Sequence, residues 1–105
     1  ERLDFARLGR LDFEAPDPQR FPALGLARAA MERGGVAGCV LNASREVALD
    51  AFIAGEIGFL DMASLVESAM DALDGLPAAT DLNDIFAADA EARRVGRGLV
   101  ARFAA

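Results

Sequence analysis

The residue types that most often carry enzymatic chemistry are largely missing from this sequence of 105 residues. Histidine, lysine, tyrosine and tryptophan do not occur. Their absence removes the commonest general base, the amine that forms Schiff bases, a phenolic acid and the best stacking side chain. Any catalysis would have to come from carboxylates, three serines, one threonine and one cysteine.

The hydroxyl and thiol groups lack the partners that would activate them. Ser44, Ser64 and Ser68 have no histidine or lysine to act as a base, which argues against a serine hydrolase, and we expect them at caps and on helix surfaces. Cys39 falls on the apolar side of an expected helix, where a lone cysteine is usually a small packing residue. It has no disulfide partner in the chain, which fits a reducing compartment.

The acidic and glycine-rich segments show no ligand-binding motif. The carboxylates that could suggest a metal site are Asp71, Asp74, Asp81, Asp84, Asp89 and Glu91. None has the alternating spacing and central glycine of a calcium loop, so we interpret them as caps and solvated faces. The glycines at 34–38 and 96–98 match neither a dinucleotide fingerprint nor a phosphate loop. The sequence therefore predicts no catalytic, cofactor-binding or metal-binding residue in this chain.

Charge and hydropathy exclude two classes of partner. The net charge of −6 argues against binding to nucleic acid or to an anionic membrane surface. No apolar run reaches the length of a membrane span or a signal-peptide core, so we expect a cytoplasmic protein.

Every charged residue from Glu46 to Glu91 is acidic, whereas only arginines are charged from Arg93 onward. We expect the last helix to pair with its acidic neighbours.

The pattern along the chain predicts two regions, an extended connector over residues 1–20 and a helical domain over 21–105. In the connector, Leu11 and Phe13 alternate with acidic residues, and the prolines at 16, 18 and 22 interrupt any regular element. Fully stretched, such a segment could span about 65 Å. The fold class we predict is mainly α, with a small four-helix bundle after the connector.

The first half of the domain is expected to form two helices. The first begins at Pro22 and ends at Gly34, and its predicted inner face is Leu24, Ala27, Ala30 and Met31. The second ends at Gly55, and its predicted apolar stripe is Val36, Val40, Ala43, Val47 and Ala51, with Phe52 beside it. Asn42 and Ser44 could cap a break within this second helix.

The second half of the domain is expected to add two more helices. Asp61 is a candidate N-cap for a helix whose inner face is Met62, Leu65, Val66, Ala69, Met70 and Leu73. Asp81 is expected to cap a short turn, and Asp89 to start a separate longer helix. The predicted inner face of that last helix is Ala92, Val95, Gly96, Leu99 and Phe103.

Three motifs in this order and spacing resemble a known family. Residues 11–22 read Leu-Asp-Phe-Glu-Ala-Pro-Asp-Pro-Gln-Arg-Phe-Pro, residues 41–47 read Leu-Asn-Ala-Ser-Arg-Glu-Val, and residues 51–53 read Ala-Phe-Ile. Together they resemble the C-terminal region of 1-deoxy-D-xylulose 5-phosphate reductoisomerase, over nearly the whole chain. The sequence starts at Glu1 instead of methionine, so we expect a piece of a longer enzyme.

The resemblance implies that catalysis and structural support belong to different parts of such an enzyme. Such an enzyme rearranges 1-deoxy-D-xylulose 5-phosphate and reduces the product with NADPH to 2-C-methyl-D-erythritol 4-phosphate, in isoprenoid biosynthesis, with a divalent metal such as Mg or Mn. Its NADPH and metal sites lie in segments without a counterpart here, so the resemblance carries no catalytic residue into this chain. It implies that the helical domain supports the catalytic domain, which would be its partner in a homodimeric enzyme.

Two further points stay open from the sequence. Asn42 and Glu46 stand one helical turn apart in the most family-like motif, and they could hold a loop of a catalytic domain or serve as a cap or tie within the helix. Ser44 and Arg45 replace the Ala and Asn that are usual in the family, which puts any buried contact of that Asn in doubt.

Two alternatives compete with the interpretation that this chain is part of a longer enzyme. One is a free-standing helical interaction module whose tail, residues 3–13, docks on an apolar groove or a sheet edge. The other is an independent carboxylate enzyme, which only the abundance of acidic residues supports. Metal analysis would decide the second alternative.

Overall fold

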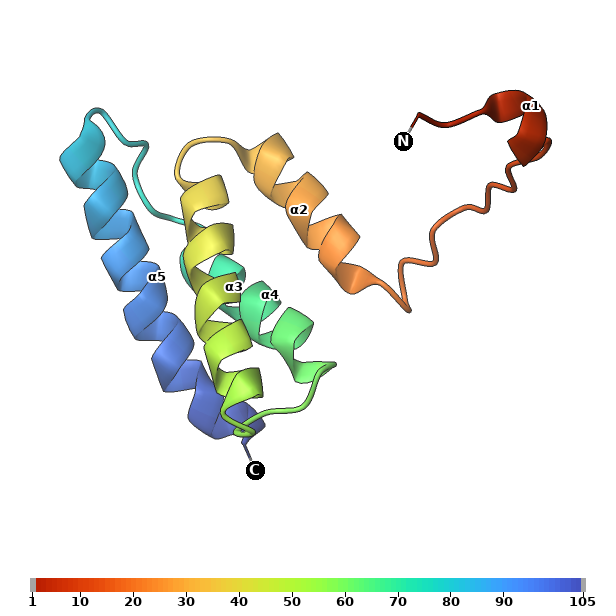
Figure 1. Cartoon of the computed structure of the whole chain (residues 1–105). Coiled ribbons are helices and arrows are strands. Elements are labelled where there is room, and N and C mark those ends of the chain that lie inside the picture. The colour runs from red at the N-terminus through yellow and green to blue at the C-terminus, as the bar shows by residue number, and fades with distance from the viewer. Residues whose placement is uncertain (1, 105) are drawn as a thin grey trace.

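The computed structural model describes residues 2–104, and the secondary structure within that range is entirely helical. Its helices are α1 (Phe5–Leu8), α2 (Pro22–Arg33), α3 (Ala37–Ile53), α4 (Asp61–Ala72) and α5 (Leu82–Phe103). Helix α3 packs against α2, α4 and α5, and α4 also packs against α2 and α5. Figure 1 shows these four long helices as one bundle, which confirms the predicted fold class. No helix within residues 2–104 is long and apolar enough to cross a membrane.

The segment before the bundle is extended except for one helical turn that the sequence pattern did not predict. The Asp4 side chain accepts hydrogen bonds from the backbone nitrogens of Ala6 and Arg7, at 3.0 and 3.4 Å, and so starts α1. Gly9 ends it with a φ of 72°, a left-handed conformation that glycine adopts readily. Every residue over 2–20 is exposed and α1 packs against no other helix, as Figure 1 shows.

The inner face predicted for the first helix is wrong at three of its four positions. Leu24 and Met31 are 58% and 76% exposed and Ala27 is exposed too, whereas Ala30 is buried and Leu26 packs against the core. Helix α2 carries apolar residues on two sides, and periodicity alone does not show which side meets the bundle. The contacts with α3 and α4 select the side of Leu26 and Ala30.

Helix α3 is continuous, and it buries predicted residues of the second helix together with Ser44 and Ala48, which were not predicted. Val40, Ala43, Val47 and Ala51 lie on its buried face. The predicted break near Asn42 is absent from α3, because Ser44 caps nothing. Its hydroxyl donates to the Val40 carbonyl oxygen at 2.7 Å, one turn back in the same helix, and the side chain is fully buried. The expectation that Ser44 lies on a surface or at a cap is therefore wrong.

The buried residues of α4 and α5 were predicted correctly except for Ala88 of α5, but the starts of these helices were not. Asp61 is the first residue of α4 and not its cap, and its carboxylate accepts a hydrogen bond from the Gly58 nitrogen at 2.8 Å, which closes the preceding turn. Asp81 caps α5 by accepting from the Asp84 nitrogen at 3.0 Å. The helix then runs unbroken through Asp89, so the separate helix predicted to start there is wrong.

The closest approach of α3 and α5 depends on a residue without a side chain. A Cβ placed on Gly96 would lie 3.3 Å from Cγ1 of Val47 on α3, whereas a Cβ on Gly98, two residues along α5, would meet nothing within 4 Å. A branched side chain at 96 has to displace Val47 or separate the helices.

We therefore expect Gly96→Val to lower the free energy of unfolding by about 1–3 kcal/mol, because it overpacks the α3–α5 contact. Gly98→Val makes the same change on the exposed side of α5 and should be neutral or slightly stabilising, since glycine is a poor helix former. Urea unfolding followed by far-ultraviolet circular dichroism measures both. Equal effects of the two substitutions would show that the close approach does not control stability.

Candidate functional site

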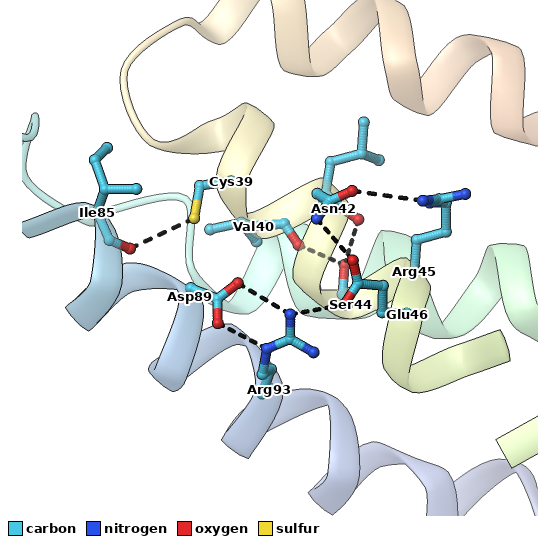
Figure 2. A network of polar contacts seen from close by, with 10 residues as sticks. Cys39, Val40, Asn42, Ser44, Arg45, Glu46, Ile85, Asp89 and Arg93 are labelled. Atoms are coloured by element: carbon cyan, nitrogen blue, oxygen red, sulfur yellow. Dashed lines mark hydrogen bonds and ion pairs between the residues drawn. The ribbon is translucent and has the colours of Figure 1, made fainter. Parts of the chain in front are cut away.

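Four polar side chains form a network across α3 and α5, and it includes both residues that the family-like motif singled out. Figure 2 shows Arg93 of α5 at its centre. Its Nη2 donates to Glu46 Oε2 of α3 at 2.7 Å and to Asp89 Oδ1 at 3.2 Å, and its Nε donates to Asp89 Oδ2 at 2.7 Å. Asn42 completes the network. The predicted pairing of the last helix with acidic neighbours is thus present in the structure.

The Asn42 side chain forms a hydrogen bond within its own helix. Its Nδ2 donates to Glu46 Oε1 at 3.1 Å, one turn further along α3. The other carboxylate oxygen of Glu46 is the one that Arg93 binds, so Asn42 and Arg93 hold the two oxygens between them. Arg45 is exposed and donates to Asn42 Oδ1 at 3.5 Å. Arg45 stands at the position where the family usually has Asn. It therefore contacts the network from the solvent side.

The charges of the network stabilise its ionised form. The hydrogen bond from Arg93, helped by the one from Asn42, lowers the pKa of Glu46 below its ordinary value of 4.5. The bonds to Asp89 and then Glu46 raise the pKa of the Arg93 guanidinium. Glu46 and Arg93 are therefore both charged at neutral pH, and their ion pair joins α3 to α5.

Cys39 lies near the network and is not activated by it. Its Sγ donates to the Ile85 carbonyl oxygen at 3.5 Å, which links the start of α3 to the start of α5 (Figure 2). Burial, and then the Asp89 carboxylate, raise the pKa of the Cys39 thiol, although Arg93 acts in the opposite direction. A thiol with a raised pKa is a poor nucleophile, and the half-buried position suits the predicted packing role.

The remaining carboxylates considered in the sequence serve as caps or as partners of nearby groups. Asp71 and Asp74 lie 3.4 and 3.3 Å from the guanidinium of Arg33. Glu91 pairs with Arg94 at 2.6 Å, which lowers the pKa of Glu91. Backbone and side-chain hydrogen bonds from Thr80 lower the pKa of Asp84.

The donor groups of the described residues do not gather into a metal-binding cluster. Among residues 2–104, no three His, Cys, Asp or Glu side chains lie close enough together to hold a metal. A cavity of about 380 Å³ lies beside the α2–α3 turn and is lined by Arg33, Val36, Met70 and Asp74 among others. Arg33 is already held by carboxylates there, so it does not offer an unpaired charge to a phosphate. No chemical step is assigned to these residues.

The sequence analysis missed a group of exposed apolar side chains where α3 leads into α4. We call Leu49, Phe52, Ile53, Phe59 and Leu60 the Phe52–Phe59 patch. The rings of Phe52 and Phe59 pack edge to face with centroids 5.8 Å apart. Phe59 and Leu60 come from a segment that the helix patterns left unassigned. Two adjacent large apolar residues outside any predicted helix were the sequence signal that could have indicated this surface.

We expect Arg93→Met to lower the urea midpoint of unfolding, because it leaves Glu46 and Asp89 close together without their shared cation. Arg94→Met is the matched control, since Arg94 is exposed and pairs only with Glu91 of its own helix. A midpoint that falls equally in both variants, measured by circular dichroism, would contradict a role for Arg93 in joining α3 to α5.

The lowered pKa of Glu46 also predicts an acid-sensitive contribution to stability. A group whose pKa is lower in the folded state stabilises the fold above its unfolded pKa, and this contribution disappears as the pH falls. For Glu46 the loss should begin near pH 4.5 and continue through the lowered pKa. Urea midpoints measured from pH 6 down to 3 should therefore fall less steeply for Glu46→Gln than for the unchanged chain. Parallel curves would refute this assignment.

Comparisons with known proteins place this fold and these motifs in a family. The family model described as the DXP reductoisomerase C-terminal domain matches residues 1–95. The 1-deoxy-D-xylulose 5-phosphate reductoisomerase of Rhizobium meliloti (strain 1021) is 66% identical over 100 residues, which cover 95% of this chain and 26% of that protein. That of Agrobacterium fabrum (strain C58 / ATCC 33970) is 59% identical over 101 residues, covering 96% of this chain and 25% of that protein.

A solved structure agrees with these relatives. The reductoisomerase from Zymomonas mobilis, determined in complex with NADPH, matches with a TM-score of 0.85 and 46% identity, over 95% of this chain and 26% of that one. The chain thus spans about a quarter of the length of the relatives that it matches. Because the family model covers residues 1–95 of 105, the chain belongs to the DXP reductoisomerase C-terminal domain family, as its sequence motifs implied.

Proposed function

We propose that this chain serves as the C-terminal helical support domain of a 1-deoxy-D-xylulose 5-phosphate reductoisomerase. The observation that carries the proposal is the match of nearly the whole chain to about a quarter of such enzymes, at up to 66% identity. A likeness of this extent in both sequence and fold supports a shared place in a longer protein. We call that longer protein the parent enzyme.

The reaction of the parent enzyme would be the conversion of 1-deoxy-D-xylulose 5-phosphate to 2-C-methyl-D-erythritol 4-phosphate. NADPH would supply the hydride and a divalent metal, Mg or Mn, would assist the rearrangement, as a step of isoprenoid biosynthesis in the cytoplasm. The Zymomonas mobilis relative in complex with NADPH supports the choice of nicotinamide cofactor. We further propose that the parent enzyme is a homodimer.

Within the parent enzyme, this chain would contribute structure and no reacting group. The carboxylates of the polar network are held by Arg93, and no metal-binding set exists among residues 2–104. We propose that residues 1–20 form the connector to the catalytic domain and that residues 21–105 form the support domain. The exposed Leu3, Phe5 and Phe13, at 74%, 71% and 87%, suit a connector that lies on another surface.

The exposed tail would also fit the free-standing interaction module. That alternative has less support, because it gives no reason for a match to one enzyme family that continues from the tail through the bundle. The two functions differ in the partner they require, which is the catalytic domain of the same enzyme in one and an unrelated protein in the other.

An NADPH oxidation assay with 1-deoxy-D-xylulose 5-phosphate tests the proposal. The 105-residue chain should show neither turnover nor NADPH binding, because the proposal places both sites in the part of the parent enzyme that this chain does not cover. The product of the complete gene should turn over in the same assay with Mg or Mn present. Turnover by the 105-residue chain would overturn the proposed function. A complete and folded gene product that shows no turnover would overturn it as well.

A further inference from the structure

The Phe52–Phe59 patch is a preformed apolar surface. Phe59, Ile53 and Leu60 are 67%, 73% and 77% exposed, and Leu49 and Phe52 are 42% and 37% exposed. The edge-to-face contact of the two rings fixes the position of Phe59, although most of that side chain faces solvent. Contiguous exposed apolar surface of several hundred Å² is often a contact surface in soluble proteins.

The size of the patch fits a contact within one chain. With roughly 200 Å² for a fully exposed large apolar side chain, the exposed fractions correspond to about 600 Å². Interfaces between domains of one chain bury about 600–1,500 Å² in total, or roughly 300–750 Å² on each side, and stable interfaces between separate proteins bury about 800 Å² on each partner. A covalent connector also removes most of the entropic cost of association.

The charges next to the patch disfavour a second copy of this chain as the occupant. Asp50 and Asp61 directly follow patch residues in the sequence, and Glu56 lies in the turn between Ile53 and Phe59, whereas the exposed Arg45, one helical turn before Leu49, is a single basic neighbour on α3. A two-fold contact of the patch with itself would bring these carboxylates together, and like charges at an interface are unfavourable. A partner with basic residues around an apolar centre fits the patch better.

We propose that the Phe52–Phe59 patch is the surface by which this domain docks on the rest of the parent chain, against an apolar area flanked by basic side chains. The inference rests on the proposed function, because the occupant is the three quarters of the relatives' length that this chain does not cover. The connector would hold the two parts together, and the patch would fix their orientation.

Hydroxyl-radical footprinting of the 105-residue chain and of the complete gene product tests the inference. Phe86, 61% exposed on α5, is the internal control for Phe59 at 67%. Phe59 should react several-fold more slowly in the complete protein, whereas Phe86 should react equally in both. The variant Phe59→Asp in the complete protein should restore the reactivity of Leu60, and Phe86→Asp should not.

Three outcomes would overturn the inference. These are equal reactivity of Phe59 in both proteins, slower reaction of Phe86 in place of Phe59, and slower reaction of Phe59 in the 105-residue chain as its concentration rises, which would indicate a second copy. Turnover of NADPH is measured on the same complete protein. Turnover without protection of Phe59 refutes only the docking surface, whereas absence of turnover refutes the proposed function.

Discussion

The structure depends on the packing of α3 against the three other long helices at once. A central helix with three neighbours needs small residues where the neighbours approach, and α3 supplies Ala43, Ala48 and Ala51 on buried positions. Gly96 does the same from the side of α5, opposite Val47. These alanines and Gly96 therefore have a structural use, because larger side chains at these points would separate the helices.

Ion pairs also join particular turns of the packed helices. The acidic middle of the chain and its arginine-rich end meet where Arg93 binds Glu46 and Asp89, so the distribution of charge along the sequence fixes how α5 lies on α3. These ion pairs are partly exposed, and such pairs contribute less to stability than apolar burial does. Their role is to join two particular helix turns, and the hydrogen bond of Asn42 to Glu46 holds the carboxylate in place for it.

Much of the fold follows from periodicity, and the errors have physical causes. The apolar stripes of α3 and α4 are unambiguous, and the sequence identifies the buried residues of α4 and those of α3 apart from Ser44 and Ala48. Helix α2 has apolar residues on two sides, so tertiary contacts had to decide between Leu24 and Leu26. Asp89 is a plausible helix start because aspartate favours such positions, whereas in α5 it lies in the interior and pairs with Arg93 one turn later. The Phe52–Phe59 patch depends on a loop that brings Phe59 back to α3, which no local pattern encodes.

The central claim is that this bundle supports catalysis that takes place in another part of a longer chain. The most direct measurement removes residues 21–105 from the complete gene product and determines both NADPH affinity and turnover of 1-deoxy-D-xylulose 5-phosphate. The account predicts that the shortened protein still binds NADPH and that its turnover falls sharply, because the catalytic part loses its support. Unchanged turnover would contradict a supporting role, and loss of NADPH binding by a protein that remains folded would place part of the cofactor site in this domain.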